Sequence, residues 1–469
     1  MDNKHRKGAL SMARSHEIDM TNGPILKKII MFSLPLMFSG ILQLLFNAAD
    51  IIVVGKFAGS LALAAVGSTT SLISLLVNVF IGISTGANVL AANYFGSRNN
   101  KDLSRCVHTS IALSGLLGIL VCFLGFFLST PMLRMMNTDP KVLPLSSLYL
   151  KIYFLGVPAT VIYNFSAAIL RAIGDTDRPL RYLFVSGIVN VVLNLITVVG
   201  FHMSVAGVAI ATAVSQYVAA ALVVICLIRS EGAYRLIPKK LAFHKSILAQ
   251  ILKLGIPAGL QSSLFSVANV MIQSSVNSFG AAVMAGNSAA ANLEGFVYTA
   301  MNALYHATLC FVGQNVGAKR FDRLKKVLLS CVLLVLLVGV LMASAVYLFG
   351  PQLLSLYISS SDPNRDAVLG YGMLRLSIVC LPYCLCGLME VGCGGLRGLG
   401  KSWTPLIITT LGACGFRIVW IATAFSAVRT LECLYLSWPI SWLLTLLAHY
   451  TVFFFSYRKI TRNARTVLP

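Results

Sequence analysis

The stretch IIMFSLPLMFSGILQLLFNAADIIVV, residues 29–54, is a long apolar run that contains one acid, Asp50. About 20 apolar residues in a row are enough for an α-helix to cross the hydrocarbon core of a bilayer, so this run predicts a membrane-spanning helix. A carboxylate at the centre of such a helix costs roughly 2.5–3.5 kcal/mol on insertion scales. We therefore expect Asp50 to face protein or water rather than lipid.

Two amides share the helix face of this acid. Gln43, Asn47 and Asp50 are spaced i, i+4 and i+7, which places them on one side of a helix. An ionisable residue inside a span is by default a functional-site hypothesis, here a cation or proton site. The alternative interpretation is a buried polar cluster that holds helices together.

The composition excludes most other classes of protein. Hydrophobic residues make up 57% of the 469 residues and charged residues 11%, and the mean hydropathy is +0.82. Soluble domains are usually about 25% charged. Outer-membrane barrels are built from short segments of alternating polarity, whereas the apolar runs here are long and continuous.

These runs predict an all-α polytopic membrane protein with twelve transmembrane helices in two pseudo-symmetric six-helix lobes. We expect a cytosolic N-terminal tail (1–24), an N-lobe (25–228), a cytosolic linker (229–249), a C-lobe (250–457) and a cytosolic C-terminal tail (458–469). The expected spans are residues 29–54, 62–90, 104–128, 145–169, 180–200, 205–228, 250–277, 283–311, 325–348, 370–394, 404–426 and 434–456.

The basic residues predict the orientation. Twelve spans place both termini on one side, and the loops and tails of that side carry 29 Lys and Arg residues against seven on the other side, Arg375 among those seven. The positive-inside rule assigns the basic side to the cytosol. This distribution accounts for most of the net charge of +22 without a nucleic-acid partner. We expect a multi-pass protein of the plasma (inner) membrane with both termini cytosolic.

The two halves of the chain repeat one motif. Residues 170–179 and 396–405 both read Leu-Arg-x-x-Gly-x-x-x-x-Pro. Because each half has an even number of spans, the halves enter the membrane the same way round. Such repeats are related by an axis along the membrane normal, with a site between them near the midplane.

Polar side chains on two further spans of the N-lobe complete a set of oxygen ligands. Asn190 and Asn194 lie on one face of span 5, and Thr212 lies in span 6. With Asp50 they supply a carboxylate, two amides and a hydroxyl, which suit Na⁺ or a proton relay and do not suit a transition metal. The alternative is a set of interhelical hydrogen bonds worth about 0.6 kcal/mol each.

The C-lobe holds several polar residues within its spans. Arg417 could form an ion pair with Glu390 or Glu294, which would neutralise the buried charge and have a structural role. The alternative is that Arg417 contacts the substrate directly. The candidates for substrate binding or gating across both lobes are Gln43, Asn47, Asn269, Gln273, Glu294, Tyr298, Glu390 and Arg417.

One motif suggests an enzyme. Asp175 and Asp177 form an Asp-x-Asp that could hold Mg²⁺, but they lie in the repeated motif, and the second copy has Lys401-Ser402-Trp403 there. The sequence contains no His-Glu-x-x-His motif. We expect no catalytic residues, no cofactor and no metal beyond Na⁺ at Asp50.

Along almost its whole length the chain resembles the multidrug and toxic compound extrusion (MATE) transporters. The residues that carry the resemblance are Asn47-Ala48-Ala49-Asp50 with Val54-Gly55, Gly207-Val208-Ala209-Ile210-Ala211-Thr212, Val312-Gly313-Gln314-Asn315-Val316-Gly317-Ala318, and the repeated Leu-Arg-x-x-Gly-x-x-x-x-Pro.

The resemblance implies a V-shaped pair of lobes with alternating access. It implies an antiporter, driven by H⁺ or Na⁺, that exports drugs or other small organic, often cationic, compounds, with Asp50, Asn190, Asn194 and Thr212 as its cation site. Its partners would be the lipid bilayer and the substrate, and we expect it to act as a monomer. The alternative is a flippase of a lipid-linked cargo from the same superfamily; a channel or a membrane enzyme ranks lower.

One departure from the family concerns the C-lobe. Some members carry a Glu in span 7, where this chain has about Phe265. This difference argues against a C-lobe cation site of that kind and leaves Glu294 and Glu390 as candidate replacements.

Overall fold

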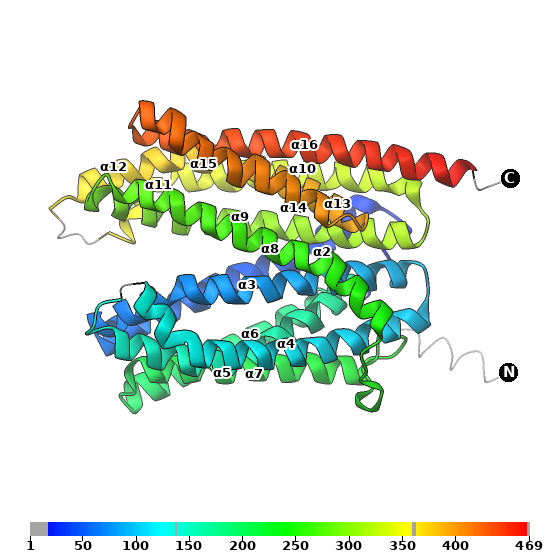
Figure 1. The fold of residues 1–469 in the computed structure, drawn as a ribbon, viewed down its shortest axis with the longest axis horizontal. Helices are drawn as coiled ribbons and strands as arrows, with labels where there is room; N and C mark the ends of the chain where they lie inside the picture. The colour runs from blue at the N-terminus through cyan, green and yellow to red at the C-terminus, as the bar shows by residue number, and fades with distance from the viewer. Residues whose placement is uncertain (1–16, 137, 359–362, 467–469) are drawn as a thin grey trace.

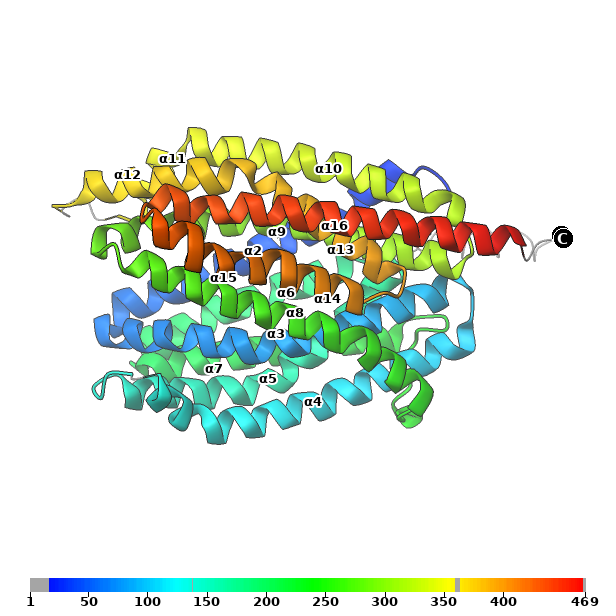
Figure 2. The ribbon, with the colours of Figure 1, turned by 45° about the horizontal axis from the view of Figure 1, so that its top comes forward.

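The computed structural model describes residues 17–136, 138–358 and 363–466, and these residues form helices and no strands. The helices run along one elongated bundle, and the described chain begins and ends at the same end of it (Figure 1). We call this the terminal end. In Figure 1, helices α8 to α16 occupy one half of the bundle and α3 to α7 the other. In the turned view of Figure 2, α4 runs along one long edge of the bundle and α10 along the opposite edge.

The first half, the N-lobe, contains six long helices. Their bounds are α2 (Ile25–Val53), α3 (Ser60–Gly96), α4 (Asn100–Met135), α5 (Leu143–Ala172), α6 (Asp177–Asn194) and α7 (Ser204–Arg229). The second half, the C-lobe, contains α8 (Lys245–Asn277), α9 (Ala281–Gly317), α10 (Phe321–Leu348), α11 (Gly350–Ser355), α12 (Arg365–Arg375), α13 (Cys384–Gly398), α14 (Trp403–Thr409), α15 (Phe416–Trp420) and α16 (Leu431–Thr466).

The predicted fold class is confirmed. Within the described ranges, eleven helical segments are long and apolar enough to cross a membrane. The remaining predicted span is α9, whose 37 residues include Asn287, Glu294 and His306. Because α9 packs against α2, α3, α10, α12 and α13, neighbouring helices bury Asn287 and Glu294. Twelve helices therefore account for the twelve predicted spans.

Five short π-helical turns interrupt the described spans. They are Val54–Ala58, Leu195–Gly200, Leu376–Cys380, Thr410–Gly415 and Ile421–Phe425. A π-helical turn is rare and is frequently found at functional sites, because it re-aims the side chains around it. All five lie within four residues of Asp50, Asn194, Arg375 or Arg417.

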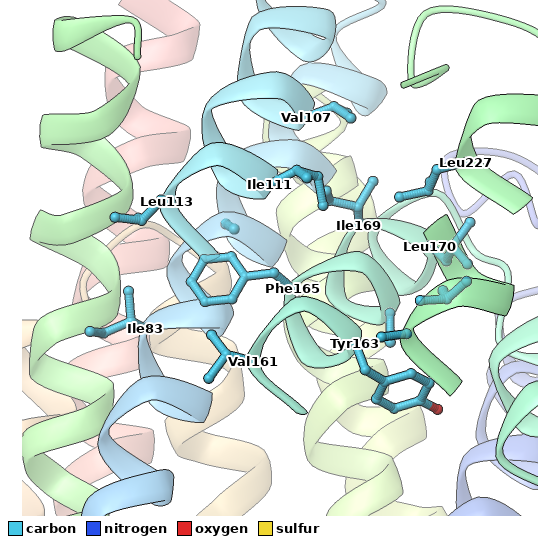
Figure 3. Packing of buried hydrophobic residues seen from close by; sticks show 14 of the residues in the cluster. Ile83, Val107, Ile111, Leu113, Val161, Tyr163, Phe165, Ile169, Leu170 and Leu227 are labelled. Atoms are coloured by element: carbon cyan, nitrogen blue, oxygen red, sulfur yellow. The ribbon is translucent and has the colours of Figure 1, made fainter. Parts of the chain in front are cut away.

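The interior of the N-lobe is a continuous apolar core. Figure 3 shows Ile169 of α5 lying beside Ile111 of α4, and Phe165 and Val161 on the side of α5 that faces Ile83 of α3. In a bilayer the lipid is as apolar as these side chains, so close packing rather than exclusion of water favours the association of helices. Small residues at the contacts are therefore expected.

Glycines allow the two halves to touch near the terminal end. A Cβ on Gly82 of α3 would lie 2.3 Å from the Cα of Gly259 in α8, and a Cβ on Gly86 would lie 2.3 Å from the carbonyl oxygen of Ile251. Towards the other end of α3, Gly67 has no heavy atom of another segment within 4 Å of such a Cβ. The halves are thus in close contact on the terminal side, as a V-shaped pair of lobes requires.

Residues 17–24, which we call the N-terminal strap, join both halves at the terminal end. Met20 is fully buried; its amide donates to Oε1 of Gln314 (3.3 Å), and Nδ2 of Asn315 donates to its carbonyl (3.1 Å). On the other side, the hydroxyl of Tyr234 donates to Oε1 of Glu17 (2.7 Å). The strap therefore bonds to α9 in the C-lobe and to the connection that follows α7.

Candidate functional site

The N-lobe brings Asp50 against α6 and α7. Nδ2 of Asn194 donates to Oδ1 of Asp50 (2.5 Å), and the hydroxyl of Thr212 faces Oδ2 at 3.5 Å. Asn190 accepts a second hydrogen bond from Nδ2 of Asn194 (3.3 Å). The structure thus places the four residues of the predicted cation site in one cluster.

Packing between α2 and α6 sets this geometry. A Cβ on Gly187 would overlap the ring of Phe46 at 1.7 Å, so only glycine lets α2 lie this close to α6. Asp50 follows Phe46 by one helical turn and Asn194 follows Gly187 by two, so both point into the same contact. The π-helical turn Leu195–Gly200 begins directly after Asn194, where the backbone departs from regular α-helix.

The cluster contains a hydrogen-bond acceptor that lacks a donor. Oδ1 of Asn194 is buried and has no hydrogen-bond partner among the described residues. A buried acceptor without a donor costs roughly 1–3 kcal/mol. A cation held between this oxygen and the Asp50 carboxylate would remove that cost, and hard oxygen ligands of this kind fit Na⁺ or a proton. The residues present therefore fit the coupling ion that the sequence predicted.

The remaining amides of α2 lie outside the cluster. Gln43 and Asn47 are exposed, although they share the helix face of Asp50. Since Asp50 lies against α6 and α7, this face turns towards the N-lobe only at the Asp50 end of the helix.

A buried ion pair organises the C-lobe. Nε and Nη2 of Arg375 donate to the two carboxylate oxygens of Glu294 at 2.9 and 2.7 Å, and Nη1 donates to Oδ1 of Asn287 at 2.8 Å. Asn287 in turn donates to Gln273 (3.0 Å). Arg375 is 6% exposed and Glu294 4% exposed. This pair neutralises Glu294 and ties α9 to α12.

The position of Arg375 corrects the sequence analysis, which counted it with the basic residues of the outer loops. It is the last residue of α12 and is buried inside a span. Burial is tolerated because Glu294 and Asn287 satisfy its guanidinium. The signal in the sequence was Glu294 itself, a mid-span acid that needs a cationic partner.

A cavity of about 480 Å³ lies between α3 and helices of the C-lobe. Residues of α3, α8, α9, α13, α15 and α16 line it, among them Trp438 and Trp442. Four of the predicted substrate or gating residues line this cavity: Asn269, Tyr298, Glu390 and Arg417.

Arg417 is held at the cavity wall by neutral groups. It is 1% exposed; Nε donates to the hydroxyl of Ser441 (3.0 Å) and Nη1 to Oδ1 of Asn269 (3.4 Å). Its guanidinium carbon lies 5.3 Å from the centroid of the Trp438 ring. Among the described residues it forms no ion pair, so the expected pairing with Glu294 or Glu390 is not formed.

Arg397 also lines the cavity, and the sequence analysis did not select it. It is 6% exposed; Nη2 donates to Oε1 of Gln261 (2.8 Å), and Nη1 donates to the hydroxyl of Tyr305. Arg397 is the arginine of the second Leu-Arg-x-x-Gly motif, which begins at Leu396. The presence of Arg in both copies of that motif was the available signal.

The family model described as MatE matches residues 35–196 and 257–423, one segment in each half of the chain. The chain belongs to the MatE family.

MatE relatives with curated names cover nearly the same length. The chain is 28% identical over 445 residues to the probable multidrug resistance protein YoeA of Bacillus subtilis (strain 168), covering 92% of this chain and 94% of that protein. It is 26% identical over 392 residues to the probable multidrug resistance protein NorM of Thermotoga maritima, covering 82% of each. These names point away from an enzyme.

Solved MatE structures share the fold. An outward-facing multidrug resistance MATE family transporter superimposes with a TM-score of 0.86 at 20% identity, over 94% of this chain and 98% of that one. The Asp-x-Asp motif has a structural role in this fold, because Asp175 pairs with Arg178 and Asp177 pairs with Arg181 at 2.5 Å. Both pairs form where α6 begins.

Proposed function

We propose that this MatE protein is an antiporter that exports small organic compounds by alternating access and is driven by inward flow of H⁺ or Na⁺. The observation that carries the proposal is the contact of Asp50 with Asn194 inside the N-lobe. A carboxylate beside an unpartnered amide oxygen forms a site that a bound cation stabilises. The stabilisation is lost when the cation leaves. The names of the relatives support drug-like cargo, and they do not favour the lipid-flippase alternative.

The coupling can work through the packing of α2 on α6. Loading a cation at Asp50 changes the charge at this contact, and the two conformations of the protein need only differ in their affinity for ion and cargo. One charge that crosses 100 mV is worth about 2.3 kcal/mol. At about 1.4 kcal/mol per factor of ten, one coupled ion sustains a roughly 40-fold gradient of a neutral cargo.

Orientation and assembly complete the proposal. The basic terminal end would face the cytosol of a plasma (inner) membrane, with residues 1–24 and 458–469 as cytosolic tails and 229–249 as a cytosolic linker between the lobes 25–228 and 250–457. In that orientation the glycine contact of α3 with α8 closes the cytosolic side. We propose that the protein acts as a monomer, since each half supplies its own polar cluster.

Transport in proteoliposomes tests the function. A pH gradient and a Na⁺ gradient are imposed separately, and uptake of a drug-like dye is followed against its own gradient. We expect uphill transport with one of the two gradients and none when a matching ionophore collapses it. Ion currents at channel rates in a planar bilayer, or dye movement indifferent to both gradients, would contradict the proposal.

A further inference from the structure

We propose that the cavity between α3 and the C-lobe binds an organic anion, a compound with a carboxylate group on a flat apolar body, and that Arg417 receives the carboxylate while Arg397 adds a second positive charge to the cavity wall. The cargo role of this compound rests on the proposed function. The binding itself does not, because the argument depends only on the charge and geometry of the cavity.

The charges in the C-lobe interior are unbalanced. Arg375 is neutralised by Glu294, whereas among the described residues neither Arg397 nor Arg417 has a carboxylate within 4 Å. The cavity wall carries these two guanidinium groups and one carboxylate, that of Glu390. A buried charge is normally paired, because removing it from water costs several kcal/mol. An anionic ligand would supply the missing charge.

Both guanidinium groups are held in place and still have a free donor. The partners of Arg417 are Ser441 and Asn269, and those of Arg397 are Gln261 and Tyr305. All four are neutral acceptors, which fix the orientation without cancelling the charge. Nη2 of Arg417 and Nε of Arg397 are buried without an acceptor in the described chain. Guanidinium groups pair with carboxylates through two parallel N–H bonds.

The rest of the cavity fits a flat apolar body. Trp438 and Trp442 line it, and the ring of Tyr383 meets that of Trp442 edge to face, with centroids 5.0 Å apart. A volume of about 480 Å³ lies in the range of small-molecule sites, roughly 300–1,000 Å³. A cationic compound would meet two like charges here, which disfavours it.

Glu390 carries the charge opposite to that of the two arginines. Its side chain lines the same cavity, so its negative charge opposes an incoming carboxylate. Removing that charge should therefore tighten binding of an anion. A residue with only a structural role would not have this effect, because its replacement leaves affinity unchanged or lowers it.

The test uses the full-length protein purified in detergent and isothermal titration calorimetry with three probes of one shape: 1-naphthoate, neutral 1-naphthamide and cationic 1-naphthylmethylammonium. We expect 1-naphthoate to bind at least tenfold more tightly than either of the others. Because no ion gradient is present, this binding experiment is independent of cation coupling. A negative binding result would not contradict the proposed coupling, and a negative transport result would not contradict binding of the anion.

Variants assign the site. Arg417→Gln should weaken 1-naphthoate at least tenfold and leave 1-naphthamide unchanged, Glu390→Gln should tighten 1-naphthoate, and the exposed Arg429→Gln should change neither. The proposal is overturned if the amide or the amine binds as well as 1-naphthoate, or if 1-naphthoate does not bind at millimolar concentration. It is also overturned if Arg417→Gln binds 1-naphthoate like the unmodified protein. The comparison of probes on the unmodified protein decides the matter even if Arg417→Gln fails to fold.

Discussion

Nδ2 of Asn315 donates to the main-chain oxygen of Met20 over 3.1 Å, although 295 positions separate the two residues. This bond attaches the N-terminal strap to α9 in the C-lobe, while Glu17 attaches it to Tyr234 beyond α7. The strap therefore spans the terminal end in the conformation in which α3 and α8 are in contact.

Met20→Ala should loosen the strap. Met20 is fully buried, and truncating a buried Met to Ala costs about 2–5 kcal/mol. We expect a lower midpoint of thermal unfolding in detergent and faster hydrogen exchange of residues 17–24. Met31→Ala is the matched control, since Met31 is 53% exposed. Equal shifts in the two variants would argue against a structural role for the strap.

The strap should be insensitive to pH in the physiological range. Burial raises the pKa of Asp19, but hydrogen bonds from Thr21 and Asn22 outweigh it and lower the pKa to about 2. Because the pKa of Asp19 is lowered in the folded state, its ionised carboxylate stabilises the folded protein. This stabilisation is fully present above the unfolded pKa of 3.8 and is lost as pH falls through about 2. Exchange protection of the Met20 amide should be equal at pH 5 and pH 8. Protection that falls between these values would point to another titrating group.

Breaking the ion pair of the C-lobe should destabilise the fold. Glu294→Gln leaves Arg375 buried without its counter-charge, which costs about 3–5 kcal/mol. The double replacement Glu294→Leu with Arg375→Met removes both charges and should recover much of the lost stability. Thermal unfolding of the unmodified protein and the two variants measures this, and a double variant no more stable than Glu294→Gln would contradict the charge argument.

Asp50→Asn should abolish uphill transport in proteoliposomes, because it keeps the size of the side chain and removes the charge that a cation requires. Folding and membrane insertion should be unchanged. Asn190→Ala should weaken the dependence on the driving ion by a smaller factor, since it supplies only a neutral oxygen. Uphill transport by Asp50→Asn at the rate of the unmodified protein would show that the coupling acid lies elsewhere, with Glu390 as the next candidate.

Gly86→Ala should disturb the contact of the two halves. The added Cβ would lie 2.3 Å from the carbonyl oxygen of Ile251, and overpacking of this kind costs about 1–3 kcal/mol. We expect slower transport and a lower unfolding midpoint. Gly115→Ala in α4 is the matched control, because a Cβ there meets no atom within 4 Å. If the two variants behave alike, the α3–α8 contact is not required.

The cation cluster could be predicted from the chain in large part. Its residues stand at helical spacing on otherwise apolar spans, and the acid is conspicuous because few charges enter a bilayer. The resemblance added the pairing of α2 with α6 and α7. It could not show that Gln43 and Asn47 are exposed, because spacing assigns residues to one face of a helix and does not say how far along the helix that face is covered.

The sequence by itself determined the membrane class, the number of spans and the two-fold repeat, because length and polarity of the runs decide what crosses a bilayer. It did not determine which buried charges meet. Glu294 and Arg375 are 81 positions apart, and their pairing depends on the rotation of α9 and α12 about their own axes. Only tertiary packing sets that rotation, and it leaves Arg397 and Arg417 facing the cavity without a counter-charge.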